Sequence, residues 1–164
     1  MNPRRPSQED PLAAVSLNLG RCGRTAQTAI ACASLLAEAH AQREGPLNSA
    51  AVARRRDLPA PLVAKVLTTL SMAGIVDGAR GPGGGYWLAK PPGEVSLQQI
   101  VAAFERPAQA HACPFGPDWC ASGKPCPLHN RLAALGGAWT DYMRNTTLAV
   151  FTQAKPVARV AYEI

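Results

Sequence analysis

Apolar residues recur three and four positions apart over residues 21–40, at positions 26, 29, 30, 33, 36 and 37. This spacing places them on one face of a helix, so the pattern predicts an amphipathic helix. The segment REGP at 43–46 then breaks the pattern. Asn48 or Ser49 can cap a short helix that ends near Arg56, because their side chains accept hydrogen bonds from the first free amides.

A second short helix is expected after a turn at 57–61. Pro61 suits its first turn, where no amide hydrogen bond is lost, and Gly74 is placed to end it. Its apolar face is formed by positions at helical spacing, namely Leu62, Val66, Leu70 and Ala73. Two short helices joined by a tight turn predict a helix-turn-helix.

The next apolar residues indicate a hairpin. Ile75 and Val76 begin one short strand, and Tyr86, Trp87 and Leu88 form its partner. The glycines between them permit the positive φ angles of a tight loop. We reject a phosphate-binding loop, since such a loop leads into a helix that starts with Lys-Ser or Lys-Thr. A hairpin after a helix-turn-helix predicts a winged helix, and a further short helix over 97–105 can be capped by the preceding serine.

The C-terminal third reads as a long loop followed by a long helix. Residues 106–126 contain four prolines, which predicts an irregular segment. Beyond it, a heptad-like seam is formed by Leu132, Leu135, Trp139, Tyr142, Thr146 and Ala149. Such a seam suits the pairing of two copies of one helix, and packing on the chain's own core is the alternative. We therefore expect a mostly α fold with a small β-wing, in which a winged helix-turn-helix precedes a long C-terminal dimerisation helix.

Composition and charge narrow the function. The chain has 164 residues, of which 47% are apolar and 5% aromatic, and this favours small, closely packed helices over a β-sandwich. A formal net charge of +6 points to an anionic partner such as nucleic acid. The N-terminus lacks the apolar core of a signal peptide, and no apolar run predicts a membrane helix. In the expected cytoplasmic setting, five cysteines indicate metal or redox chemistry rather than disulfides.

A helix-turn-helix bound to double-stranded DNA offers base contacts from the early, exposed positions of its second helix. Those positions are Ala60, Val63, Ala64 and Lys65, and Lys65 is the best candidate to reach a base edge. Further DNA contacts are predicted around the helix pair and in the wing, for Arg54, Arg55, Arg56, Thr68, Thr69, Arg80, Gly83 and Tyr86. No catalytic set can be argued from the spacing, so we do not predict an enzyme.

The loop and the start of the last helix hold a possible ligand set of Cys113, Cys120, Cys126 and His129. Thiolates suit zinc, copper(I) and iron–sulfur clusters, and imidazole is compatible with zinc and iron. Structural zinc sites usually have closer cysteine pairs, whereas histidine can replace cysteine on one iron of a two-iron cluster. The spacing alone leaves an iron–sulfur cluster, a zinc ion and free thiols open.

Four stretches together resemble the IscR/NsrR/RirA family of bacterial regulators. They are GRTAQTAIA at 23–31, the helix pair at 48–73, RGPGGGYWLAKPPGEVSLQQIVAAFE at 80–105, and the spaced cysteines followed by RNTTLAVF. The resemblance covers about residues 17–152 and implies a dimeric winged-helix transcription factor. The expected segments are a flexible arm (1–16), the winged helix-turn-helix domain (17–105), a cluster-binding loop (106–129), the dimerisation helix (130–152) and a C-terminal tail (153–164).

The resemblance also implies a ligand set by position. The iron–sulfur ligands would be Cys113, Cys120, Cys126 and, as in the IscR branch, His129. In the NsrR branch the fourth ligand is an aspartate from the partner's first helix, and Arg24, which cannot ligate, stands at that position here. A 2Fe-2S cluster is therefore favoured, and a 4Fe-4S cluster with Cys22 or a small molecule as fourth ligand is the other arrangement. Cys22 and Cys32 are otherwise expected to be small buried hydrophobes.

The function expected from these features is a DNA-binding transcriptional regulator. It would be a cytoplasmic, nucleoid-associated homodimer that acts as a repressor and senses iron, redox or nitric-oxide status through its cluster. Ala64 stands where many family members carry glutamate in the recognition helix, so the operator sequence is not implied. The alternative is a zinc-stabilised or thiol-redox DNA-binding regulator without a cluster.

Overall fold

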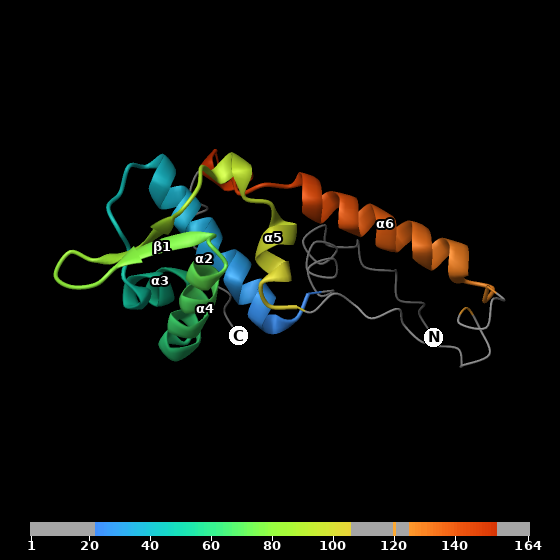
Figure 1. Cartoon of the computed structure of the whole chain (residues 1–164), viewed down its shortest axis with the longest axis horizontal. Coiled ribbons are helices and arrows are strands. Elements are labelled where there is room, and N and C mark those ends of the chain that lie inside the picture. The colour runs from blue at the N-terminus through green and yellow to red at the C-terminus, as the bar shows by residue number, and fades with distance from the viewer. Residues whose placement is uncertain (1–21, 106–119, 121–124, 154–164) are drawn as a thin grey trace, which may run out of the picture.

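The fold is a helical body with one small hairpin and one projecting helix (Figure 1). A computed structural model describes residues 22–105, 120 and 125–153. In chain order the elements are α2 (Arg24–Ala41), α3 (Ser49–Arg56), α4 (Ala60–Met72), β1 (Val76–Ala79), β2 (Gly85–Leu88), a 3-10 turn (Pro92–Glu94), α5 (Leu97–Ala102), α6 (His129–Asn145) and α7 (Ala149–Thr152). The mostly α fold class with a β-wing is confirmed. The predicted N-terminal arm and most of the predicted tail lie outside the described residues.

The predicted signals set the boundaries of the helix-turn-helix. The side chain of Asn48 caps α3, because its Oδ1 accepts a hydrogen bond from the amide of Ala51 at 2.8 Å. Asp57, with a φ of 52°, ends α3 in the left-handed conformation. Pro61 lies in the first turn of α4, and Gly74, with a φ of 67°, follows its last residues. Local capping therefore fixes where each of these helices stops.

The buried face of α4 differs from the predicted one. The core contains Val63, Val66, Leu67 and Leu70, whereas Leu62 is only partly buried and Ala73 is exposed. The buried set has steps of three, one and three residues, which keep it on one stripe of the helix that faces α2 and α3. The predicted set begins with two steps of four and drifts around the helix axis.

The hairpin is fastened to the helical body at its base. Strands β1 and β2 are antiparallel, with Val76 opposite Leu88, and both of these residues are buried. Tyr86 and Leu47 exchange two backbone hydrogen bonds of 2.8 and 3.1 Å. A Cβ on Gly85 would lie 2.6 Å from the carbonyl carbon of Leu47, so only glycine permits this close approach. The base of the wing is therefore fixed to the loop between α2 and α3.

Helix α5 begins with the predicted serine cap and ends beside α2. Ser96 and Gln99 form a capping box, in which each side chain accepts a hydrogen bond from the other's amide, at 3.3 and 2.9 Å. Just beyond α5, a carboxylate oxygen of Glu105 accepts a hydrogen bond from the amide of Gly23. The end of α5 is thus attached to the start of α2.

The predicted helix over residues 130–152 is two helices rather than one. Helix α6 ends at Asn145, so Thr146 and Ala149 are not part of an α6 seam. The chain becomes extended because it pairs with the segment before α5: Thr146 accepts a hydrogen bond from the amide of Leu97, and the amide of Leu148 donates to Val95, both at 2.9 Å. Leu148 is fully buried as a result.

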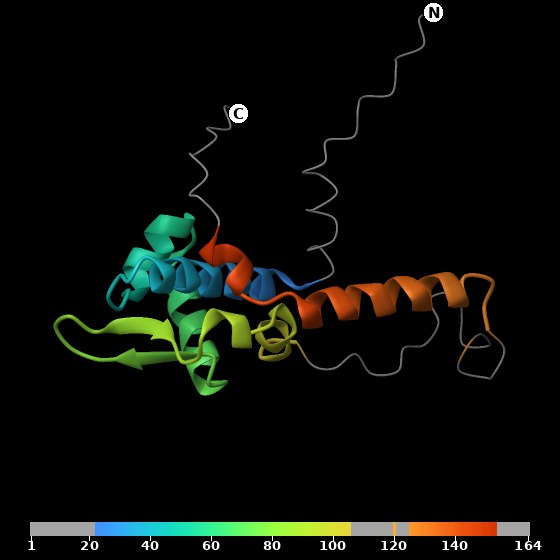
Figure 2. The ribbon, with the colours of Figure 1, turned by 90° about the horizontal axis from the view of Figure 1, so that it is seen from above.

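Helix α2 is the centre of the core and contacts α3, α4, α5 and α7. Its small residues, among them Ala29, Ala33 and Ala37, are fully buried and let the neighbouring helices approach closely. The wing and α6 project from this body in opposite directions, as two perpendicular views agree (Figure 2). Within the described residues, no helix combines the length and apolar character needed to cross a membrane.

Candidate nucleic-acid interface and metal-ligating residues

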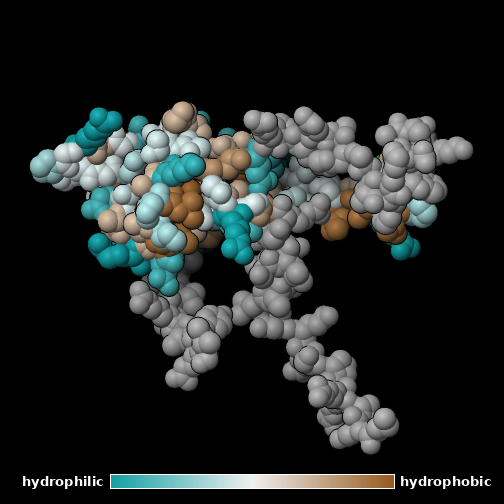
Figure 3. Space-filling view, turned by 90° about the horizontal axis from the view of Figure 1, so that it is seen from below, coloured by the Kyte–Doolittle hydropathy of each residue, from teal (hydrophilic) through white to brown (hydrophobic). Residues whose placement is uncertain are grey.

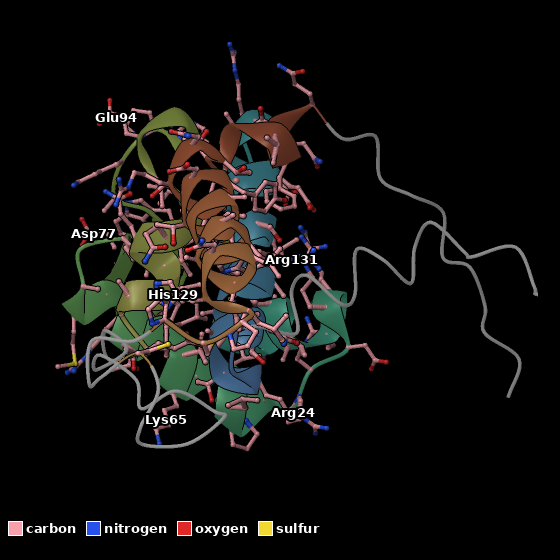
Figure 4. All side chains as sticks on the ribbon, turned by 90° about the vertical axis from the view of Figure 1, so that its right-hand side faces the viewer. Arg24, Lys65, Asp77, Glu94, His129 and Arg131 are labelled. Atoms are coloured by element: carbon pink, nitrogen blue, oxygen red, sulfur yellow. The ribbon has the colours of Figure 1, made fainter. Side chains whose placement is uncertain are left out.

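The recognition helix α4 presents a short polar face. Lys65 is exposed and points away from the domain body (Figure 4). Thr68 is also exposed, and its hydroxyl donates to the carbonyl oxygen of Ala64 at 2.9 Å. Val63, which we predicted to be an exposed candidate for base contact, is fully buried, so that prediction is wrong. Val63 is buried because it lies on the stripe of α4 that faces α2 and α3.

The three successive arginines at the end of α3 have three different environments. Arg54 is exposed. Arg55 forms a bidentate ion pair at the surface, and Arg56 turns back against α2. Successive helical residues point about 100° apart, so one charged run cannot present all three side chains to the same partner. Arg54 therefore faces solvent, Arg55 pairs with a surface carboxylate, and Arg56 is directed toward α2.

Arg56 links α3 to α2. Its guanidinium donates to the carbonyl oxygen of Ala31 at 3.0 Å, to Ser34 Oγ at 2.9 Å and to Glu38 Oε1 at 2.6 Å. About a quarter of each side chain of the Arg56–Glu38 pair is exposed. Arg56 therefore has a structural role, and a phosphate contact by this residue would have to compete with three internal hydrogen bonds.

Arg55 is held by Glu44 from the α2–α3 loop. Nη1 donates to Oε1 at 3.2 Å and Nη2 donates to Oε2 at 2.7 Å, so both carboxylate oxygens are used. The pair is exposed, at 44% for Arg55 and 27% for Glu44. The hydrogen bonds from Arg55 lower the pKa of the Glu44 carboxyl, and those same bonds raise the pKa of Arg55. Both groups are thus charged at neutral pH.

The wing and α4 enclose a cleft of about 340 Å³. Thr68 and Met72 line it from α4, and Arg80 and Tyr86 line it from the hairpin. Gly83, with a φ of 76°, forms the turn at the wing tip. The structure therefore brings Thr68, Arg80 and Tyr86 together along one groove, although Thr68 belongs to α4 and the other two residues belong to the wing.

Two residues of the predicted metal-ligand set meet at the start of α6. Cys120 Sγ lies 3.3 Å from His129 Nδ1. His129 is the first residue of α6 and its amide donates to the carbonyl of Cys126 at 2.9 Å. The positive end of the α6 dipole lies at this point, and it favours negative charge such as that of a thiolate.

Of the other two residues of that set, only Cys126 is described, and it is not grouped with this pair as a metal site. The Cys126 side chain is 5% exposed, and Cys113 lies outside the described residues. In the part of the chain that the structure describes, no three His, Cys, Asp or Glu side chains are grouped closely enough to hold a metal ion. The described site is therefore a thiol–imidazole pair with a third thiol nearby in sequence.

The remaining candidates near α2 fall into two kinds. Arg24 is exposed at the start of α2 (Figure 4). Cys22 and Cys32 are buried, as expected for small hydrophobes. Burial raises the pKa of the Cys32 thiol to about 11, against an opposing effect of Arg56. Cys32 is therefore a neutral core residue at physiological pH.

Helix α6 carries an exposed apolar stripe. Leu128, Leu132, Leu135 and Tyr142 are 40%, 46%, 57% and 52% exposed. Trp139 is half-buried and its ring centroid lies 5.9 Å from that of Tyr142. Figure 3 shows brown, hydrophobic surface along the projecting part of α6. The predicted dimerisation residues thus lie on one stripe of α6. Trp139 packs partly against the core, and Met143, four residues further along the same stripe, is fully buried.

Sequence reasoning missed Glu44, Glu38 and Glu105. Glu44 was treated only as part of the break at 43–46, and its ion pair joins residues eleven positions apart. Neither helix spacing nor strand alternation relates such positions. An excess of acidic residues close to the basic run was the available signal, and it does not identify which pairs form.

Comparison with known proteins gives the context for this geometry. Residues 24–154 match the Rrf2 family, described as an iron-dependent transcriptional regulator. The HTH-type transcriptional regulator IscR of Pectobacterium carotovorum subsp. carotovorum (strain PC1) is 32% identical over 139 residues, which cover 85% of this chain and 81% of IscR.

Two solved structures share the fold. IscR of T. potens has a TM-score of 0.63 at 21% identity, over 84% of this chain and 91% of that one. CymR, the global cysteine regulator of B. subtilis, has a TM-score of 0.67 at 20% identity, over 81% and 97%. The winged helix is thus shared with regulators of more than one kind. The family match over most of the chain and the curated relative lead to one conclusion: the chain belongs to the Rrf2 family of transcriptional regulators.

Proposed function

We propose that this chain is a homodimeric repressor whose binding to double-stranded DNA responds to iron, redox or nitric-oxide status through an iron–sulfur cluster. The cluster is of the 2Fe-2S type, and its ligands are Cys113, Cys120, Cys126 and His129. The observation that carries this proposal is the contact of 3.3 Å between Cys120 Sγ and His129 Nδ1 at the start of α6.

The geometry of this pair suits two ligands of one metal ion. Thiolate and imidazole bonds of about 2.3 and 2.0 Å to a tetrahedral ion hold the sulfur and nitrogen about 3.5 Å apart. The donors are a soft thiolate and an imidazole, the combination compatible with both iron and zinc. Cys126 is buried, so its side chain has to turn toward this pair to complete the set. When bound, the cluster supplies a one-electron redox centre that also reacts with nitric oxide or is lost when iron is scarce.

The DNA part of the proposal rests on the exposed face that joins α3, α4 and the wing. Lys65 is assigned to a base edge and Arg54 to phosphate, since both are exposed and basic. Arg80 and Tyr86 border the cleft beside α4, and we assign this groove to the DNA backbone.

The dimer part rests on the exposed stripe of α6. Helix α6 has 17 residues and includes Gly136 and Gly137, each costing about 1 kcal/mol relative to alanine. A projecting helix of this length is marginal in water without packing. The stripe from Leu128 to Tyr142 has steps of four, three, four and three residues, which is the spacing of a two-helix seam. A second copy of α6 therefore fits this face.

The proposal is tested by anaerobic purification followed by analysis of iron, acid-labile sulfide and zinc. The expected result is a coloured protein with iron and sulfide in equal amounts. His129→Ala should shift its visible spectrum, and Asn130→Ala, the next exposed position of α6, should not. A colourless protein with stoichiometric zinc would refute the cluster. An unchanged spectrum in His129→Ala would move the fourth ligand elsewhere.

A thiol-redox or zinc-stabilised regulator is the second candidate, and the same pair favours it. A thiolate beside an imidazole is also the arrangement of a reactive cysteine. Metal analysis separates these candidates, because a zinc-stabilised regulator would contain zinc without iron and a thiol-redox regulator would contain neither metal. Reversible loss of DNA binding under mild oxidation of the metal-free protein would then identify it.

A further inference from the structure

The three arginines of α3 differ in how available they are to an anion. Arg56 is used inside the domain, and Arg54 is exposed. The availability of Arg55 is intermediate. Its side chain is exposed, but both of its terminal nitrogens donate to the carboxylate of Glu44. Arg55 belongs to the helix that precedes α4 by a three-residue turn, and thus to the face assigned above to DNA.

A carboxylate and a phosphate compete for the same donors of a guanidinium. Both accept two parallel N–H bonds from one edge of its planar fork, and one edge serves only one of them at a time. Glu44 engages Arg55 through both oxygens at 2.7 and 3.2 Å. While this pair is intact, the Nη1/Nη2 edge of Arg55 is not available to a DNA phosphate, and its positive charge is neutralised within contact distance.

We infer that Glu44 restrains sequence-independent DNA binding by holding Arg55 away from phosphate. This inference rests on the proposed DNA-binding face. Sequence-independent binding depends almost entirely on phosphate contacts and their release of counterions. A carboxylate that withdraws one such contact therefore weakens binding to random DNA.

The strength of this restraint is limited by the exposure of the pair. An ion pair that is 44% and 27% exposed is of the surface type, and such pairs change an equilibrium by at most about fivefold. Glu44 therefore does not prevent Arg55 from reaching phosphate. It modestly lowers the affinity of Arg55 for phosphate. This effect becomes weaker as ionic strength rises, because the pair itself is screened.

The neighbouring carboxylate does not do the same. Glu38 raises the pKa of Arg55 by its charge, but its hydrogen bond is to Arg56. Its removal would take away the carboxylate partner of Arg56 and so weaken the α2–α3 contact rather than release Arg55. Glu44 is the residue whose change isolates the effect.

The test compares Glu44→Gln with Glu94→Gln in the full-length protein. Both variants raise the net charge by one, and Glu94 is exposed on the opposite side of the molecule from Lys65 in the view of Figure 4. The measurement is fluorescence anisotropy with a duplex of random sequence, over about 50 to 200 mM KCl. Glu44→Gln should bind about threefold to fivefold more tightly than Glu94→Gln at low salt. Its plot of log affinity against log salt should be steeper by about 0.9, the value for one added phosphate contact.

The double variant Glu44→Gln/Arg55→Gln shows whether the gain in affinity for the random duplex depends on Arg55. If the inference is correct, it loses the whole gain, and Arg55→Gln alone costs less than the same change made in the Glu44→Gln background. Equal affinities of Glu44→Gln and Glu94→Gln would overturn the inference and leave the proposed function intact. A gain that survives in the double variant would overturn it as well. A wild-type protein that binds no duplex would overturn the proposed function together with the inference.

Discussion

Replacing Arg56 with alanine should destabilise the domain although the residue belongs to a run of surface charge. The change removes three hydrogen bonds that join α3 to α2, with the carbonyl of Ala31, Ser34 Oγ and a carboxylate oxygen of Glu38 as acceptors. It also leaves the half-buried Glu38 without its counter-charge.

The magnitude follows from the depth of the pair. Exposed ion pairs are worth up to about 1 kcal/mol, whereas breaking a buried pair costs about 3–5 kcal/mol. Arg56 and Glu38 are each 26% exposed, between these limits. The three bonds share one guanidinium and do not add independently. We therefore expect Arg56→Ala to lower the free energy of unfolding by about 2–3 kcal/mol.

Urea denaturation followed by far-UV circular dichroism, at one fixed protein concentration, measures this loss. With a slope of about 1–3 kcal/mol per molar urea, the midpoint should fall by about 1 M or more. Arg54→Ala removes the same charge from an exposed neighbour and should stay within about 0.5 kcal/mol of wild type. Equal stabilities of the two variants would refute the reasoning that burial separates these adjacent arginines.

Three further predictions concern the core, the wing and α6. Cys32 is fully buried with a pKa near 11, so iodoacetamide at pH 8 should leave it unmodified in the native protein and label it in urea, as peptide mass spectrometry would show. Gly85→Ala places a Cβ 2.6 Å from the carbonyl carbon of Leu47 and should cost about 2 kcal/mol or more in thermal unfolding. A stability equal to wild type would mean that the wing base tolerates separation from that loop. Leu135→Glu should shift the protein to monomer in analytical ultracentrifugation, while Ala134→Glu, its exposed neighbour, should do so much less if the stripe is the seam.

Features that depend on local chemistry could be predicted from the sequence. Asn48 or Ser49 was expected to cap α3 and Ser96 to cap α5, and of these Asn48 and Ser96 form the capping hydrogen bonds. The glycine-rich turn of the wing follows from the need for positive φ, which Gly81 and Gly83 adopt. These signals act over two to four residues, so one sequence contains all the information they need.

Features that depend on distant partners could not be predicted. The end of α6 at Asn145 is caused by pairing of Thr146 with Leu97, almost fifty positions earlier in the chain. The heptad pattern gave no sign of this, because its apolar spacing continues through the break. The inward turn of Arg56 has the same origin, since it depends on where α2 lies. For the metal-ligating residues, spacing suggested a set, and the structure brings Cys120 and His129 together.

The extended segment after Asn145 has a mechanical consequence for the rest of the molecule. It fixes the C-terminal end of α6 to the strand-like residues before α5, and the other end of α6 begins at His129. Seventeen residues span about 25 Å. Helix α6 is therefore held at its C-terminal end, and a tilt of only 5° about that end moves His129 by about 2 Å. A displacement of about 2 Å at His129 thus corresponds to a rotation of about 5° between α6 and the domain body.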